Sequence, residues 1–95
     1  MKFLLEEGFS TELIDKLEKK FDPATIELLE IESDNVIEVI NYLREIGIKN
    51  IETIILTYVE LFTRDIDDVK KEFNKHNIPD VVAKINEDIF YIENI

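Results

Sequence analysis

Few residues of this chain could act in catalysis or bind a metal, and most of them lie at the ends of predicted helices, where they have structural roles. The single histidine, His76, lies beside Asn77 near the expected end of a helix. The dipole at that end stabilises a protonated imidazole, so we interpret His76 as structural rather than as a catalytic base or metal ligand. The only two serines, Ser10 and Ser33, precede predicted helices, where a hydroxyl caps the first turn. A serine nucleophile is therefore not expected.

Metal and thiol chemistry find no support in the sequence. Asp65, Asp67 and Asp68 have part of the spacing of a calcium-binding loop, but the sixth and twelfth positions are Lys70 and His76. That loop needs glycine and glutamate there. With no cysteine, the chain has no zinc–thiolate cluster, disulfide or thiol nucleophile, and it has no glycine-rich phosphate loop. We therefore expect neither an enzyme nor a bound cofactor or metal.

The formal charge of −11, from 22 acidic and 11 basic residues, bears on the possible partners. Nucleic-acid-binding proteins need a basic surface, so direct DNA or RNA binding is the least favoured hypothesis. Between Lys20 and Arg44 there is no basic residue. This stretch is interpreted either as a solubilising surface with acids at helix starts, or as a docking face for a basic protein, or as a mimic of nucleic-acid charge. The candidate partner-binding acids are Glu27, Glu30, Glu32, Asp34 and Glu38.

The C-terminal segment is unusually apolar for the end of a repeat stack, which normally carries a polar cap. It contains Phe90, Tyr91, Ile92 and Ile95. The favoured interpretation is that this segment folds back onto the last helix. The alternative is that Phe90, Tyr91 and Ile95 form an adhesive end through which copies of the chain associate.

These side chains must be positioned by a repeating pattern of short helices. The apolar positions of Asn35–Phe62 and Asp65–Ile92 coincide without a gap at a step of thirty residues. Gly47 falls on Asn77 in this alignment, and both residue types tolerate the left-handed backbone that ends a helix. The matching apolar pairs are Val36 with Ile66, Val39 with Val69, Leu43 with Phe73, Ile48 with Ile78, Ile51 with Val81, Ile55 with Ile85, Val59 with Ile89 and Phe62 with Ile92.

Such a period is typical of stacked helical units. An earlier, partial copy begins with Leu4, Gly8, Phe9, Leu13 and Leu17. The sequence therefore predicts an all-α fold, a small stack of short helices with about two and a half units. We expect about five to seven elements and one core shared by Leu43, Ile55, Phe73 and Ile85.

Helix boundaries follow from capping residues. Residues 2–7 are predicted to form a short helix that ends at Gly8, and Ser10 is predicted to cap the next. Asp22-Pro23 is a helix start, and we prefer a helix to a strand for Ala24–Ile31 because no partner strand is apparent. Ser33, Asp34 or Asn35 is expected to cap the following helix. Val59–Phe62 is predicted as a short piece, residues 65–77 as a helix, and the last helix is expected to start near Pro79 and to carry Ile89 and Ile92.

Leu43-Arg44-Glu45-Ile46-Gly47-Ile48 is followed by Ile51, Ile55 and Tyr58–Phe62, and Leu4–Phe9 has a similar opening. This helix-turn spacing resembles the repeats of the mitochondrial transcription termination factor family. Phe73–Ile78 looks like a degraded copy. The resemblance implies stacked helices. Those proteins bind nucleic acid along a basic surface, whereas this chain is acidic and has Tyr58 where the family's proline is expected.

The sequence thus predicts one domain over residues 1–95. No signal peptide or membrane-spanning run is visible, so we expect a cytoplasmic protein. The abundance of Ile, Lys, Glu, Asn and Asp suits an AT-rich bacterial genome. The favoured function is a non-enzymatic interaction module that binds another protein, with a basic protein as the candidate partner. The alternative is an acidic mimic that regulates a DNA- or RNA-binding protein.

Overall fold

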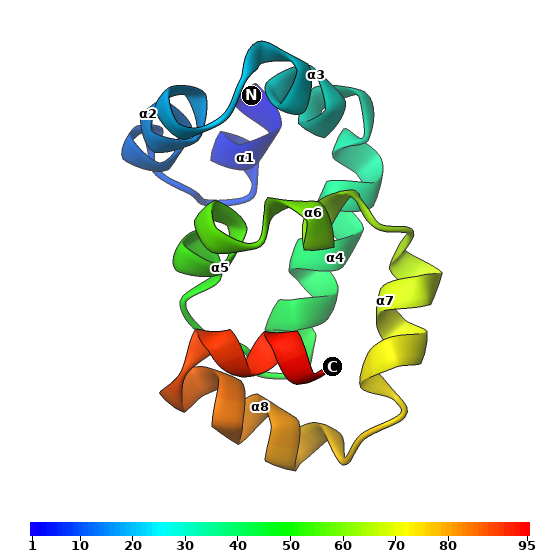
Figure 1. Cartoon of the computed structure of the whole chain (residues 1–95). Coiled ribbons are helices and arrows are strands. Elements are labelled where there is room, and N and C mark those ends of the chain that lie inside the picture. Colours follow the sequence, from blue (N-terminus) through cyan, green and yellow to red (C-terminus); the bar gives the residue numbers. More distant parts are fainter.

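The computed structural model describes all residues 1–95 as helices joined by short turns, with no strand (Figure 1). The prediction of an all-α fold is confirmed. The elements are α1 (Lys2–Glu6), α2 (Thr11–Lys20), α3 (Pro23–Ile31), α4 (Ser33–Glu45), α5 (Ile51–Thr57), α6 (Val59–Thr63), α7 (Ile66–Phe73), α8 (Ile78–Glu87) and the 3₁₀ helix η1 (Ile89–Asn94).

The thirty-residue repeat corresponds to two sets of three elements. α4, α5 and α6 form one set, and α7, α8 and η1 form the next, each with two helices followed by a short third piece. α1, α2 and α3 add a set at the N-terminal end, so the predicted partial copy also has three elements. The nine elements exceed the expected number, partly because the last helix stops at Glu87. Asp88 leaves the helical conformation there (φ −152°, ψ 108°), and its carboxylate accepts a hydrogen bond from the backbone N–H of Phe90 at 3.0 Å.

Side-chain caps fix most helix starts. The Ser10 hydroxyl oxygen accepts from the Leu13 N–H at 3.3 Å, and the Asp22 carboxylate accepts from the Thr25 N–H at 2.8 Å, as the sequence predicts. The hydrogen bonds from Thr25 lower the pKa of Asp22. Gly47 has a φ of 98°, in the left-handed region that ends a helix.

Two predicted turn residues have other roles. Asn77, expected to end a helix as Gly47 does, has a φ of −74° and caps α8, because its side chain accepts from the Asp80 N–H at 3.1 Å. α7 accordingly ends at Phe73, earlier than predicted. None of Ser33, Asp34 and Asn35 caps α4, because the helix already begins at Ser33, its N-cap is Glu32 and no side chain makes a capping hydrogen bond. Asn35 lies within the first turn. Its amide reaches the link between α6 and α7 instead.

The side chains of Asn35 and Asn86 act as amide brackets between sets. The Asn35 amide nitrogen donates to the carbonyl oxygens of Phe62 and Arg64, and its oxygen accepts from the Ile66 N–H at 3.0 Å. Asn86, on α8, accepts from the Lys49 N–H at 2.8 Å and donates to the Gly47 carbonyl oxygen at 3.1 Å. Each bracket ties together segments that are distant in sequence.

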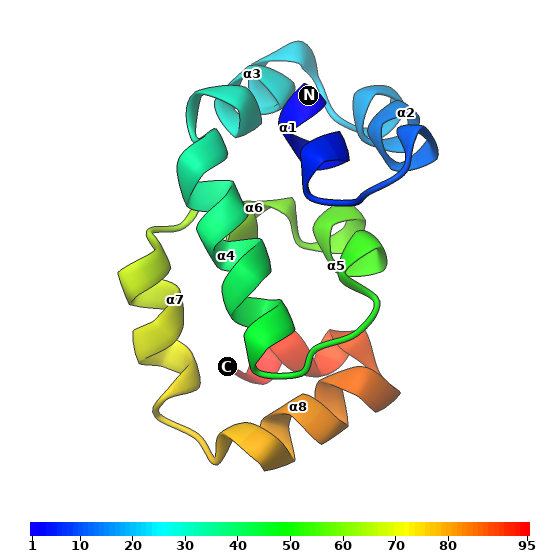
Figure 2. The ribbon, with the colours of Figure 1, turned by 180° about the vertical axis from the view of Figure 1, so that it is seen from behind.

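One apolar core lies along α4, the longest helix, with α5 and α7 on opposite sides of it and α6 packed against it between them (Figures 1 and 2). α1, α2 and α3 lie at one end of the molecule, and α8 and η1 lie at the opposite end. All 21 buried side chains are apolar and belong to a single cluster. Leu43, Ile55, Phe73 and Ile85 are among them, so the predicted shared core is confirmed.

Candidate functional site

A hollow of about 320 Å³ lies between α2 and α3 and combines an apolar floor with an acidic rim. We call it the acidic hollow. Phe21 and Ile26 supply its apolar side chains. The complete lining is Glu18, Phe21, Pro23, Ile26, Glu27 and Glu30.

The link between the two helices produces this arrangement. α2 ends at Lys20, and Phe21 takes an extended conformation with φ −109° and ψ 154°. Asp22 then caps α3, and Pro23 occupies its first turn. This abrupt change of direction places Glu18, on the last turns of α2, across the hollow from the α3 carboxylates.

The charge of the acidic hollow is only partly compensated within the molecule. Glu30 binds the amine of Met1 at 2.7 Å, but no lysine or arginine lines the hollow. The ammonium of Lys20 lies 5.5 Å from the centroid of the Phe21 ring and donates a hydrogen bond to the Leu56 carbonyl oxygen on α5. Across the whole chain only four of the 22 acidic side chains form ion pairs, namely Glu7, Glu30, Glu72 and Asp80. The surface therefore retains a strong negative potential at this site.

The structure brings together only some of the acids that the sequence singles out. Glu27 and Glu30 share the acidic hollow with Glu18, which the sequence analysis did not select. Glu32 is half-buried at the junction of α3 and α4, and Asp34 is exposed at the start of α4. Glu38 lines a different hollow, which lies between α4 and α7.

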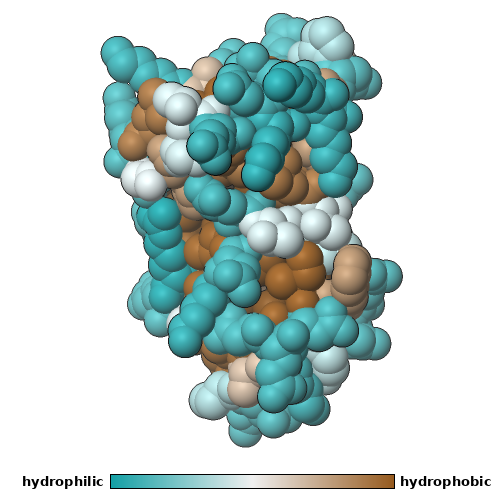
Figure 3. Space-filling model, turned by 90° about the vertical axis from the view of Figure 1, so that its left-hand side faces the viewer, coloured by the Kyte–Doolittle hydropathy of each residue, from teal (hydrophilic) through white to brown (hydrophobic).

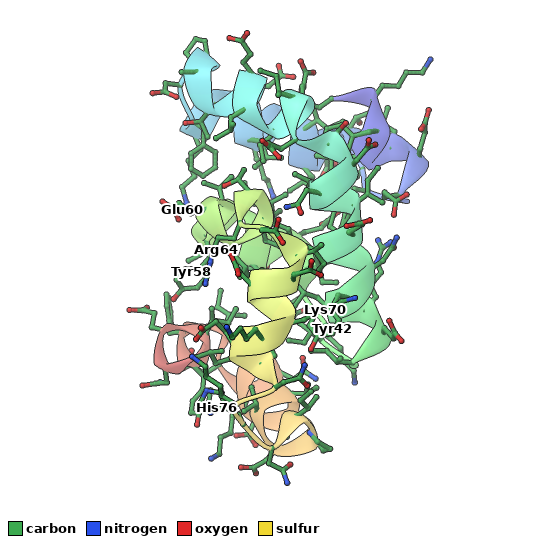
Figure 4. The ribbon with its side chains drawn as sticks, turned by 90° about the vertical axis from the view of Figure 1, so that its right-hand side faces the viewer. Tyr42, Tyr58, Glu60, Arg64, Lys70 and His76 are labelled. Atoms are coloured by element: carbon green, nitrogen blue, oxygen red, sulfur yellow. The ribbon has the colours of Figure 1, made fainter.

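That second hollow holds about 340 Å³ and mixes charges of both signs. The Lys70 ammonium lies 5.6 Å from the centroid of the Tyr42 ring, and Figure 4 shows these two residues next to each other beside α7. The Tyr42 hydroxyl is buried and has no hydrogen-bond partner, and burial raises its pKa. The Tyr42 ring packs edge-on against Phe73, with 5.9 Å between the ring centroids. We therefore interpret Tyr42 as a residue that packs against the core.

The largest hollow, about 410 Å³, lies beside the turns at Gly8 and Gly47. Its arginine, Arg44, is already engaged: it donates to the Glu7 carbonyl oxygen at 2.8 Å and stacks over the Phe9 ring at 4.8 Å. We interpret these contacts as a structural tie between the first and second sets.

The C-terminal residues lie against the rest of the molecule, with one exposed aromatic ring. Tyr91 and Ile95 pack on the core, whereas Phe90 is 58% exposed and touches Tyr58 edge-on at 6.4 Å. The Tyr58 hydroxyl donates to the Glu93 carboxylate at 2.6 Å. Burial, this hydrogen bond and the negative charge of Glu93 raise the pKa of Tyr58 to about 12. Self-association through this end stays a hypothesis.

The raised pKa of Tyr58 gives a prediction about pH. Because the un-ionised phenol donates to Glu93, the stabilisation is fully present below the ordinary pKa of 10.0 and is lost as the pH rises towards about 12. In an absorbance titration of tyrosinate, we expect a component near pH 12 that disappears in the Tyr58→Phe variant. Below pH 10 that variant is also expected to melt at a lower temperature than the wild type. The same late component in Tyr58→Phe would contradict the assignment.

Catalytic and metal sites are not evident in the geometry. His76 is exposed at the turn that leads into α8 (Figure 4). No group of three or more histidine, aspartate or glutamate side chains is placed to hold a metal ion.

None of the helices combines the length and the apolar character that crossing a membrane requires. On the face at the α2 and α5 side, hydrophilic side chains cover most of the surface and hydrophobic ones show between them (Figure 3).

The distribution of charge along the sequence identifies only Glu27 and Glu30 among the residues that line the acidic hollow. Phe21 directly precedes the Asp22-Pro23 helix start, and Glu18 lies three residues before Phe21. A helix that ends next to another helix start must bring its last turn close to the first turns of the next. That signal could have added both residues to Glu27 and Glu30.

A scan against models of protein families finds no match to this chain, and searches of curated proteins and of solved structures find none either.

Proposed function

We propose that this chain is a non-enzymatic helical-repeat module that binds another protein, and that its acidic hollow receives a basic segment of that partner. The observation that carries the proposal is the coincidence of three carboxylates with an apolar floor in a hollow that no basic side chain lines. The resemblance to the mitochondrial transcription termination factor repeats supports the helical-repeat part of the proposal. Their basic nucleic-acid-binding surface has no counterpart in a chain of charge −11.

The hollow suits a lysine or arginine side chain in two ways. The aliphatic part of such a side chain can pack on Phe21 and Ile26 while its charged end meets the carboxylates. A neutral apolar group would leave the Glu18 and Glu27 carboxylates without a partner, and an anion would be repelled.

A second candidate function is competition with nucleic acid for a basic protein. The segment from Phe21 to Leu43 has no basic residue, so its carboxylates could occupy a surface that otherwise binds phosphates. The two functions differ in one measurable property. Under the second, DNA or RNA displaces the partner from this chain, whereas under the first the partner stays bound.

A synthetic lysine-rich peptide, measured by fluorescence anisotropy at several salt concentrations, tests the acidic hollow. We expect the combined substitutions Glu18→Gln, Glu27→Gln and Glu30→Gln to weaken binding by roughly tenfold at low salt, and this difference to shrink as salt rises. The reason is that the three carboxylates act on the same bound cation at short range.

The control variant carries Glu60→Gln, Asp68→Asn and Glu87→Gln, three exposed acids outside ion pairs and on other helices. It removes the same number of negative charges, so it reports the effect of net charge alone. We expect it to weaken binding by less than about twofold. Equal losses in the two variants would show that the hollow has no special role and would contradict the proposal.

A further inference from the structure

The outward side of α3 is apolar where a surface helix is normally polar. Among its apolar side chains only Leu29 is fully buried. Leu28 is 42% exposed. Ile31 is 71% exposed, more than any other large hydrophobic side chain. A helix with apolar residues around most of its circumference normally has them covered by other elements. Here α3 lies at one end of the molecule, with α4 to η1 all to one side of it (Figures 1 and 2).

The exposed apolar residues form a continuous line. Ala24, Leu28 and Ile31 follow the spacing i, i+4, i+7 and are all exposed, so they share one stripe along α3. We call them the apolar stripe. Glu27 and Glu30, which line the acidic hollow, occupy the sector of the helix surface next to this stripe. A partner that lies along α3 therefore meets apolar residues and carboxylates side by side.

We infer that the partner presents a cationic amphipathic helix to α3. This inference rests on the proposed function and names the element that the partner uses. Apolar side chains at helical spacing cover the apolar stripe, and lysine or arginine side chains on the adjoining face reach Glu27, Glu30 and the hollow. Charge complementarity selects this occupant. A second copy of the chain brings a further charge of −11 to a surface already rich in unpaired carboxylates, and an anionic membrane surface meets the same repulsion.

Two synthetic peptides of identical leucine and lysine content test the inference. In one the leucines recur at helical spacing, and in the other the same residues are scrambled. We expect the helical arrangement to bind at least about tenfold more tightly, because it alone buries the apolar stripe. We also expect the binding of the helical peptide to induce its helical circular-dichroism signal.

Ile31→Ser removes the most exposed part of the stripe with little effect on folding, since the side chain is already largely in water. We expect it to weaken binding of the helical peptide by roughly tenfold and to leave the scrambled peptide unaffected. The control is Phe90→Ser, which removes another exposed apolar side chain at the opposite end of the molecule. It is expected to change neither affinity.

The outcomes separate this inference from the proposed function. If both peptides bind equally and only the glutamate variants weaken them, the acidic hollow is supported and the amphipathic helix is overturned. If Ile31→Ser instead converts a dimer of this chain to a monomer in sedimentation experiments, the stripe is an interface between copies, and the inference fails. If neither the stripe nor the glutamates affect binding, both proposals fail.

Discussion

Replacing Phe62 with alanine is expected to lower the free energy of unfolding by about 3–5 kcal/mol. Phe62 is completely buried on α6, a short helix that packs against α3, α4 and α5. Removing its ring leaves a cavity at the meeting point of the first two sets, and the neighbouring helices cannot close it without losing their own contacts. Since small proteins are stable by only about 5–15 kcal/mol, much of the total would be lost. Urea unfolding followed by circular dichroism measures the change.

Two further variants calibrate this result. Phe62→Leu retains most of the volume and is expected to cost about 1–2 kcal/mol, so its stability stays closer to that of the wild type than the stability of the alanine variant. Phe90→Ala removes a ring that is 58% exposed and is expected to cost less than about 1 kcal/mol. Similar losses for Phe62→Ala and Phe90→Ala would mean that the core is not organised around α6.

Replacing Asn35 with alanine is expected to cost about 2 kcal/mol, a large effect for a polar side chain near the surface. The substitution leaves the Phe62 and Arg64 carbonyl oxygens and the Ile66 N–H without their partner. Three backbone groups are affected because the link between α6 and α7 is too short to satisfy them itself. Faster hydrogen exchange of the Ile66 amide, measured by NMR, would report the local loss directly.

Asn41 on the same helix provides the matched control. It is exposed, and no side-chain hydrogen bond ties it to another element. Asn41→Ala is therefore expected to change stability by less than about 0.5 kcal/mol and to leave exchange at Ile66 unchanged. Equal behaviour of the two variants would contradict the bracket role of Asn35.

The sequence predicts this fold well where a local rule decides the structure. The thirty-residue period anticipates two matching sets of elements. Ser10, Asp22 and Gly47 act as the caps and turn that their types favour. The prediction fails where a residue has two possible uses. Asn77 could end one helix or cap the next, and Pro79 in the first turn of α8 favours the cap.

Contacts between residues that are distant in sequence are the main feature of this structure that the sequence does not predict. Asn35 has the spacing of a capping box with Glu38, so the local rule predicts a cap. Its actual partners lie up to 31 residues away, beyond the reach of any such rule. The candidate site shows the same limit. Charge alone pointed to Glu27 and Glu30, but their association with Glu18 and with an apolar floor depends on the angle between α2 and α3.

The apolar pattern of α3 was also open to two interpretations. Ile26, Leu28, Leu29 and Ile31 cannot all face inward from a single helix, since they surround most of its axis. That mismatch is visible in the sequence, although the choice of helix over strand rests on the lack of a partner strand. It accounts for the exposed Leu28 and Ile31, the side chains that we propose a partner covers.

An interior made only of hydrocarbon and aromatic groups has an evolutionary consequence. With no polar atom among the 21 buried side chains, nothing inside dictates which aliphatic residue must stand at a given position, provided that the volume is kept. Relatives of this chain are therefore expected to exchange leucine, isoleucine and valine freely, and to keep asparagine at positions 35 and 86. Such lineages would diverge quickly in sequence while the arrangement of their helices persists.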